Sequence, residues 1–341
     1  MKKKLHKILG IGLTLVMALS LTVALAPVAA AADYEENDWG TWGLPSLDAD
    51  TDVGPIAVAP DGTLYAAVND DGDWKVMKSE DDGYTWDDTE LDDAADTIED
   101  IAVSPNYDDD ETVYVGCADG TVYRLEEAGD GDVTALKTIT DNEGIDAREL
   151  FSLDVWTDED DYNWILVGTD IDVFVLKDKR FEDWRDQELN EVAYEVAFAP
   201  DFDDSELIWA VTEDDRGDFL VTSTVSPGQW GQEIGDAEID LAATPLADLG
   251  FPDDYDSDPD SGLTNLWVAV SDGADGGDIF LIEGVEAPDD SIAIAMFTYI
   301  GGEDPCDFTS IAVSGDYGDE VILAGEQDSP TVWISDDGGY S

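Results

Sequence analysis

The chain has 341 residues, of which 43 % are hydrophobic, and its 84 Asp and Glu against 14 Lys and Arg give a formal net charge of −70. Such a charge repels nucleic acid and anionic lipid and attracts cations, so a nucleic-acid-binding function is excluded. The single histidine, His6, lies in the leader described next. The rest of the chain therefore has no imidazole for a Ser-His-Asp triad, a Cys-His pair or a His-ligated zinc site, and we assign no catalytic residue.

Residues 1–32 have the features of a signal peptide. A basic start, Met1–Lys4 with Lys7, precedes the apolar run Ile8–Ala26, and Ala29–Ala32 offers small residues for cleavage. We expect an exported protein at the cell surface or outside the cell; an uncut membrane anchor is the alternative. Without the four leader lysines, ten basic residues face all 84 acidic ones, a net charge of −74. No later segment approaches membrane-spanning length.

The remainder of the chain repeats one order of short apolar runs, each bounded by Gly, Pro or Asp. Three runs follow one another in each repeat, which is typical of antiparallel strands. No long helix-period segment interrupts them, so residues 33–341 are predicted to be one all-β domain. The first run of each repeat is the expected innermost strand: Pro55–Pro60, Asp100–Pro105, Ser152–Val155, Glu195–Pro200, Asp240–Pro245 and Ser310–Ser314.

The spacing of these repeats predicts a β-propeller. Successive centres lie 43 to 52 residues apart except for a last interval of 70, and a four-stranded blade needs about 40–50 residues. We attribute the excess to an acidic insertion, Leu246–Leu263. A tryptophan follows the first strand by 29 to 33 residues in three repeats, at Trp86, Trp184 and Trp230. The expected fold has four-stranded antiparallel blades, six of them visible, in a six- or seven-bladed ring.

One turn between strands carries a recognisable motif. Ser79–Trp86 fits the pattern Ser-x-Asp-x-Gly-x-x-Trp, and Ser335–Ser341 begins a second copy; Ser223–Trp230 keeps Ser and Trp but has lost the Asp. In such a turn the Ser and Asp oxygens accept main-chain N–H bonds, Gly takes a positive φ and Trp packs beneath. The predicted structural residues are Ser79, Asp81, Gly83, Trp86, Ser335, Asp337 and Gly339.

The second copy stops before its tryptophan, and two compatible explanations are open. In the first, which we favour, the sequence is a fragment whose last blade lacks its outer strand. In the second, Asp38–Leu44 supplies the missing strand and closes the ring. The predicted domain, residues 33–341, is accordingly expected to be truncated at its C-terminal end.

Acidic residues gather in the turns, and one turn suggests a cation site. Asp256, Asp258 and Asp260 alternate along the chain and are followed by Gly262. Carboxylate oxygens on a short loop are the ligands that calcium prefers. The spacing departs from an EF-hand, because Gly262 is one place late and Trp267 occupies the twelfth position. We predict calcium as a structural cofactor, with solvated acidic loops as the alternative.

The motif and the repeated strands resemble the Asp-box (BNR) repeat superfamily, which includes sialidases, xyloglucanase-type glycosidases, sorting-receptor ectodomains and non-enzymatic surface proteins. The resemblance spans residues 38–341. Sialidases of that superfamily clamp substrate with an arginine triad in a setting that is absent before the first blade here, so sialidase activity is not expected. The leader, the acidity and turns such as Ser104–Tyr107 and Ala199–Phe202 resemble bacterial surface-layer-like Asp-box proteins. That resemblance implies a non-catalytic structural or interaction role at the cell surface.

Two other functions stay open. One is a carbohydrate- or protein-binding module that uses aromatic residues such as Trp156, Tyr162 and Trp164. The other is a glycoside hydrolase acting on a neutral polysaccharide, which needs only two placed carboxylates. The expected partners are further copies in a surface lattice, other envelope proteins or glycans. Cys117 and Cys306 allow either a disulfide or two separate thiols.

Overall fold

The computed structural model describes residues 52–339 with interruptions, the longest at 140–148, 214–218, 238–245, 272–276, 284–291 and 297–305. The predicted leader and Asp38–Leu44 lie outside the described residues. Strands dominate the described chain, and its helices are short turns: α2 (Tyr107–Asp110), α3 (Phe202–Ser205) and the 3-10 turn η1 (Glu127–Gly129). No helix within the described ranges is both long and apolar enough to cross a membrane.

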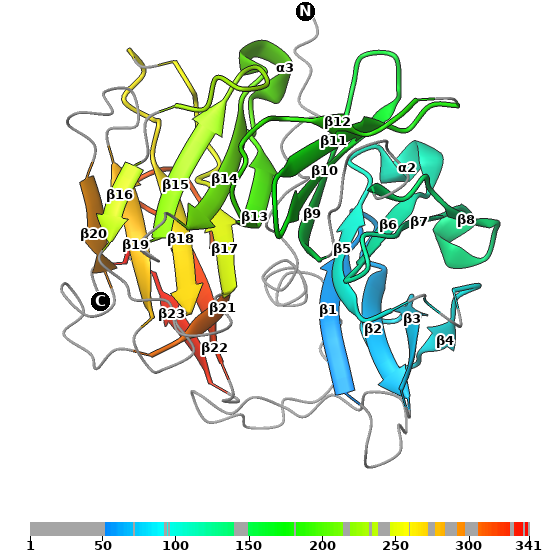
Figure 1. The fold of residues 1–341 in the computed structure, drawn as a ribbon. Helices are drawn as coiled ribbons and strands as arrows, with labels where there is room; N and C mark the ends of the chain where they lie inside the picture. Colours follow the sequence, from blue (N-terminus) through cyan, green and yellow to red (C-terminus); the bar gives the residue numbers. More distant parts are fainter. Residues whose placement is uncertain are drawn as a thin grey trace, which may run out of the picture.

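The strands form six antiparallel sheets, and in each sheet the strands lie in their order along the chain (Figure 1). The first sheet contains β1 (Asp52–Val58), β2 (Leu64–Asp70), β3 (Asp73–Ser79) and β4 (Asp87–Asp88). The second contains β5 (Ile98–Val103), β6 (Val113–Cys117), β7 (Val122–Leu125) and β8 (Val133–Ala135). The third contains β9 (Leu150–Thr157), β10 (Asn163–Thr169), β11 (Val173–Lys177) and β12 (Arg185–Asp186).

The other three sheets repeat this arrangement. The fourth contains β13 (Ala193–Phe198), β14 (Ile208–Glu213), β15 (Phe219–Thr224) and β16 (Ile234–Ala237). The fifth contains β17 (Leu246–Gly250), β18 (Leu266–Ser271), β19 (Asp278–Glu283) and β20 (Ile292–Ala295). The sixth has three described strands, β21 (Phe308–Ser314), β22 (Val321–Glu326) and β23 (Val332–Ser335).

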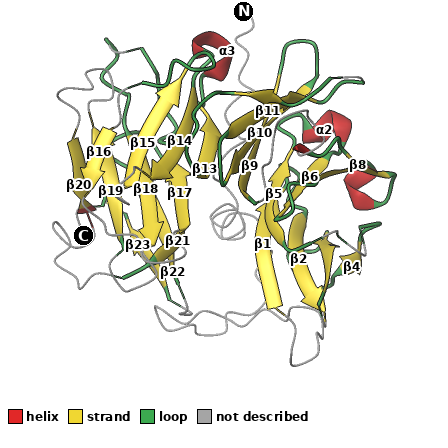
Figure 2. Ribbon diagram, viewed as in Figure 1, coloured by secondary structure: helices red, strands yellow, loops and turns green. Residues whose placement is uncertain are grey.

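The six sheets follow one another around a common centre, and the first strand of each lies nearest that centre (Figure 2). The core consists of apolar layers between neighbouring sheets. Tyr65 and Val76 of the first sheet, for example, pack with Ile101 and Val115 of the second. Since side chains of a strand alternate between its two faces, each sheet contributes one face to the layer before it and the other to the layer after it. The predicted all-β propeller with four-stranded antiparallel blades is confirmed.

One innermost strand differs from its predicted position. The predicted run Asp240–Pro245 lies outside the described residues, and the innermost strand of the fifth sheet is β17, Leu246–Gly250. These five residues form the start of the predicted insertion, Leu246–Leu263, so that prediction is wrong for them. The connection between β17 and β18 therefore begins only after Gly250.

Candidate functional site

The Asp-box segment forms the turn between β3 and β4. The Ser79 hydroxyl accepts a hydrogen bond from the Gly83 N–H at 2.9 Å and donates one to Asp81 at 3.0 Å. Asp81 accepts bonds from the N–H and the hydroxyl of Thr85, both at 2.7 Å, and these bonds hold its pKa below the usual range. Gly83 has a φ of 82°, and the Trp86 indole donates to its carbonyl at 3.2 Å. These contacts stay within the turn, so they order the hairpin locally.

The second copy repeats the first of these bonds. The Gly339 N–H donates to Ser335 Oγ at 2.9 Å, while Asp337 lies outside the described residues. In the degenerate copy, the Ser223 carbonyl accepts the Gly231 N–H at 2.6 Å. The motif is therefore a device for shaping turns in this chain, and we place the candidate site elsewhere.

Two of the regularly spaced tryptophans join neighbouring sheets. The Trp184 indole, which precedes β12, donates to the carbonyl of Lys137, just after β8. The Trp230 indole donates to the carbonyl of Gln187, just after β12, at 2.9 Å. Each tryptophan thus bonds to the outer part of the sheet before its own, which gives a structural reason for its recurrence.

The predicted calcium residues lie between β17 and β18. Asp256 accepts the N–H of Asp258 at 2.8 Å, and Asp258 accepts that of Asp260 at 3.0 Å, so two of the carboxylates cap successive turns of their own loop. Ser257, between them, is bound through its N–H and hydroxyl to Asp201, next to α3, at 2.8 and 2.6 Å. Across the described ranges, no group of three or more His, Cys, Asp or Glu side chains is placed to hold a metal ion. Calcium binding stays a prediction.

Three aspartates on innermost strands bridge neighbouring sheets. Asp100, Asp154 and Asp248 each accept the N–H of the following residue at 2.7 to 2.8 Å. With its other oxygen, each accepts a second N–H at 2.7 to 2.8 Å from the innermost strand of the next sheet. The partners in those strands are Leu153, Phe198 and Ile311 respectively. One carboxylate per strand therefore fixes the position of the next strand.

These carboxyls resist ionisation. Burial raises the pKa of Asp100 to about 6, that of Asp154 to about 8 and that of Asp248 to about 7, although the main-chain bonds favour the charged form. Glu195 on β13 is the fourth member, and burial together with the charges of the other three raises its pKa well above the usual range. The innermost strands thus concentrate acidic groups that prefer to hold a proton.

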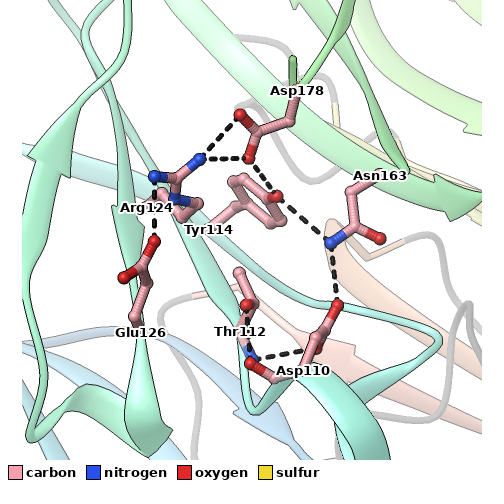
Figure 3. A network of polar contacts seen from close by, with 7 residues as sticks. All are labelled: Asp110, Thr112, Tyr114, Arg124, Glu126, Asn163 and Asp178. Carbon is pink, nitrogen blue, oxygen red and sulfur yellow. Dashed lines mark hydrogen bonds and ion pairs between the residues drawn. The ribbon is translucent and has the colours of Figure 1, made fainter. Parts of the chain in front are cut away.

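The seam between the second and third sheets holds a network of polar side chains (Figure 3). Tyr114 on β6 donates its hydroxyl proton to Asp178 at 2.6 Å, and Arg124 on β7 donates to both oxygens of Asp178 at 2.8 and 2.9 Å. Asn163, at the start of β10, donates to the Tyr114 hydroxyl at 3.2 Å and to Asp110 at 3.0 Å. The network therefore connects β6, β7 and the turn α2 with the start of β10 and the residue that follows β11.

The electrostatics of this network favour a structural joint. Burial, reinforced by the charge of Asp178, raises the pKa of Tyr114 above its usual range, so the phenol stays protonated. Burial alone would lower the pKa of Arg124, but its bonds to Asp178 outweigh that effect and raise it. Arg124 also forms an ion pair with Glu126 at 2.9 Å. Because two carboxylates already engage this guanidinium, it is not free to clamp the carboxylate of a substrate.

The opposite face of the third sheet carries a different set of side chains. Trp164 on β10 and Lys177 on β11 are directly opposed in the strand pairing. They alternate with Asn163 and Asp178, which turn toward the second sheet, so Trp164 and Lys177 belong to the face that packs toward the fourth sheet. Arg185 on β12 pairs with Val175, two residues before Lys177, and shares that face.

Cations cover the aromatic rings on this face. Lys177 Nζ lies 4.6 Å from the ring centre of Tyr162 and 5.0 Å from that of Trp164. Lys179 Nζ lies 4.7 Å from the Tyr162 ring, and the Arg185 guanidinium lies 5.0 Å from the Trp164 ring. We name these five residues the cation–aromatic surface. Lys179 and Arg185 are exposed, and the other three are partly buried.

A carboxylate anchors the inner side of this surface. Asp158 accepts bonds from Lys177 Nζ at 2.5 Å and from the Trp164 indole at 2.9 Å. Burial would raise its pKa, but these bonds and two main-chain N–H bonds, from Tyr162 and Asp160, outweigh it and lower the pKa to about 2. Asp158 therefore stays ionised and fixes Lys177 and Trp164 in place.

The surface lies in the part of the sequence where positive charge is concentrated. Seven of the ten basic residues outside the leader fall between residues 124 and 185. They are Arg124, Lys137, Arg148, Lys177, Lys179, Arg180 and Arg185. Except for Arg148, which lies outside the described residues, they belong to the second and third sheets or to the turns beside their strands. In a chain with a net charge of −74 outside its leader, this makes the region chemically distinct.

Of the aromatics proposed for recognition, Trp156 has another role. Its ring lies 4.8 Å from that of Phe202 and 6.4 Å from that of Phe198, inside the contact between the third and fourth sheets. The two cysteines are not joined by a disulfide: Cys117 is buried on β6, and Cys306 is partly buried before β21.

Tyr162 and Trp164 are candidates from the sequence alone, whereas their cationic partners and the bridging aspartates emerge only from the structure. The sequence signal for the cationic partners is the density of Lys and Arg after Asn163. The sequence signal for the bridging aspartates is a single acid within an otherwise apolar innermost run, as at Asp100 and Asp154.

The architecture defines the class of protein: the chain is a β-propeller. No protein-family profile matches the sequence, and no curated protein matches it. The fold is similar to virginiamycin B lyase from Staphylococcus aureus, with a TM-score of 0.55, 11 % identity and 83 % of each chain covered. It is also similar to the Cps50 (Swd1) β-propeller domain from Myceliophteria thermophila, with a TM-score of 0.53, 11 % identity and 83 % of each chain covered. At this identity the likeness shows the fold alone.

Proposed function

We propose that this chain is an exported, non-catalytic β-propeller that acts as an interaction module at the cell surface. The observation that carries the proposal is the cation–aromatic surface, where the exposed Lys179 and Arg185 lie on the third sheet of a strongly acidic protein. Locally opposite charge on a propeller rim is suited to recognition of a partner. The signal-peptide features of residues 1–32 support export.

The non-catalytic part of the proposal is supported by the residues themselves. No histidine follows the leader, Arg124 is held by Asp178 and Glu126, and the bridging aspartates accept main-chain bonds from neighbouring strands. These groups are used to hold sheets together. The resemblance to Asp-box surface proteins fits such a role.

Cell fractionation and surface labelling test the proposal. We expect the protein in the envelope or medium fraction and accessible to a protease added to intact cells, whereas a variant without residues 1–32 stays inside. Recovery of the complete chain from the cytosol, protected from protease, would contradict export and a surface role.

We include calcium in the proposal as a stabilising ion. Carboxylate-rich turns such as Asp256–Asp260 supply suitable oxygen ligands, although hydrogen bonds within the loop occupy some of them. Thermal melts in calcium and in magnesium at equal ionic strength separate specific binding from screening. We expect a higher midpoint in millimolar calcium, and identical midpoints in the two salts would remove calcium from the proposal.

A second candidate function, hydrolysis of a neutral polysaccharide, is favoured by one observation. Burial and the charges of Asp248, Asp100 and Asp154 raise the pKa of Glu195 well above its usual range, so an acid that holds its proton lies among other carboxyls on the innermost strands. Glycoside hydrolysis needs such an acid together with a second carboxylate. A screen of neutral glucans for released reducing sugar tests it. Activity that is lost in Glu195→Gln while the fold persists would establish the enzyme, and no release from any glucan would end this candidate.

A further inference from the structure

We infer that the cation–aromatic surface binds the acidic turns of a second copy of this chain. The inference deepens the proposed interaction function by naming the partner, and it rests on that function. It depends on three features of the described residues: cations that have no acid partner, aromatic rings that are already covered, and a supply of exposed carboxylates on other sheets.

The first feature is the state of the exposed cations. Five other described cations form ion pairs with carboxylates within the chain: Lys75, Lys78, Arg124, Lys137 and Lys177. Lys179 and Arg185 differ, because within the described residues each makes a cation–π contact but no ion pair. In a chain with 84 acidic residues, two exposed cations left for an outside anion form a complementary surface.

The second feature decides which kind of ligand fits. Stacking on a sugar needs an aromatic face that is open to solvent. Lys177 and Lys179 both lie over the Tyr162 ring, and Lys177 and Arg185 lie over the Trp164 ring. These rings therefore hold cations in position and are poorly placed to stack on a neutral sugar. A carboxylate that approaches the cations gains charge-assisted hydrogen bonds.

The third feature is the source of the anion. After the innermost strand, the second and fourth sheets present the acidic turns α2 and α3, in which Asp108, Asp109 and Asp204 are exposed. Figure 1 shows α2 and α3 on either side of the third sheet. Neighbouring copies therefore offer carboxylates in short, ordered turns of the kind that a small cationic surface can bind.

The contact would join unlike surfaces, since the cations lie on the third sheet and the acidic turns lie on others. Such a heterologous contact adds copies head to tail and produces a ring or an open array. An array of this kind is the assembly expected of a surface-lattice protein. The net repulsion between copies opposes it, so the contact requires enough salt to screen long-range charge.

Sedimentation velocity of the purified chain over a concentration series at about 0.15 M salt, where the Debye length is about 8 Å, tests the inference. The test variants are Lys179→Glu, Arg185→Glu and the pair of changes together. The matched control is Lys75→Glu, which alters the net charge equally but lies on the first sheet, where it pairs with Asp88. We expect the wild type and the control to self-associate and each single test variant to do so about tenfold more weakly.

Three outcomes would overturn the inference. The wild type sediments as a monomer at every concentration, or the test variants associate as strongly as the wild type, or the control weakens as much as they do. Circular dichroism melts of each variant identify one that has unfolded, and Lys179→Gln then replaces Lys179→Glu. Fractionation of cells that express the double variant or the wild type separates the two proposals. If the double variant reaches the surface and no longer self-associates, the proposed function is retained. If the wild type remains in the cytosol, the proposed function is rejected.

Discussion

Asp154 shows how a single residue is used twice in this propeller. Its carboxylate accepts the Val155 N–H of its own strand and the Phe198 N–H of the next sheet, both at 2.7 Å. It is buried, with 7 % of its surface exposed. The residue therefore accepts two hydrogen bonds, but its ionised carboxylate is buried away from water. The free-energy cost of burying that charge makes the stability of the fold depend on pH.

Stability is expected to decline as the pH rises. Burial, with a smaller contribution from Asp100, moves the pKa of Asp154 from 3.8 to about 8. The folded state therefore binds the proton more tightly than the unfolded state. The stabilisation is complete below 3.8 and is lost as the pH passes through about 8. Asp100 and Asp248, whose pKa values burial raises to about 6 and about 7, act in the same direction.

Urea unfolding from about pH 5 to about pH 8 measures this effect, and Asp154→Asn should remove on the order of 2 kcal/mol from the wild-type difference. The amide cannot ionise, so the variant has a flatter pH profile. The control, Asp87→Asn, changes an exposed acid on β4 and should retain the full slope. Equal slopes for Asp154→Asn and the wild type would contradict our account of this carboxyl.

At the scale of one element, the hairpin of β3 and β4 depends on a side-chain hydroxyl. Ser79 is buried, with 1 % of its surface exposed, and it accepts the Gly83 N–H. Ser79→Ala leaves that donor without its partner, so we expect a loss of about 1–2 kcal/mol in the free energy of unfolding. Chemical denaturation measures it. The control is Ser226→Ala, in the degenerate copy. It should lower the free energy of unfolding by less, since the N–H and carbonyl of Ser226, which the substitution keeps, form its hydrogen bonds.

Between elements, the Tyr114 hydroxyl is the centre of the seam shown in Figure 3. Tyr114→Phe removes the donor to Asp178 and the acceptor for Asn163, so we expect about 1–3 kcal/mol of destabilisation. Thermal and urea unfolding measure it. Tyr84→Phe, on a side chain that is 69 % exposed, is the matched control. If both variants lost the same free energy of unfolding, the hydrogen bonds of Tyr114 in the seam would not contribute to stability.

The elements also show where sequence reasoning worked and where it failed. Alternation and regular spacing located five of the six innermost strands, because their runs, such as Ile101–Val103, are apolar and end at turn residues. The strand that was not located is β17, the innermost strand of the fifth sheet. It contains Asp248 at its centre, and this acid made the run resemble a loop. Asp100 and Asp154 occupy similar runs, so a buried acid was a repeated feature of these strands.

The candidate site was less predictable than the fold. Tyr162 and Trp164 were considered as ligand-binding aromatics, but strand pairing was needed to bring Lys177 opposite Trp164. The position of Arg185, eight residues farther along the chain, depends on the register between β11 and β12. The hairpin between β11 and β12 sets that register. Because β12 has only two residues, it shows no alternation of apolar and polar side chains from which the register could be predicted.

For the whole molecule, charge opposes compaction. Outside the leader the net charge is −74, and its mutual repulsion is relieved on unfolding. Raising sodium chloride from about 0.01 M to about 1 M shortens the Debye length from about 30 Å to about 3 Å. We therefore expect the thermal midpoint to rise by about 5 °C or more, as a gain of a few kcal/mol would produce. Melts in sucrose of equal osmolality are the control, and a midpoint that does not move with salt would contradict this account.

The reactivity of the Cys117 thiol reports on separation of the first two sheets. This residue is buried on β6, in the apolar layer shared with β2 of the first sheet, and burial raises the pKa of its thiol to about 12. A maleimide dye reacts with thiolate and needs access, so Cys117 stays unlabelled for as long as the first two sheets remain in contact. In a Cys306→Ser background, the rate of dye incorporation would therefore time how often this propeller opens between its first two blades.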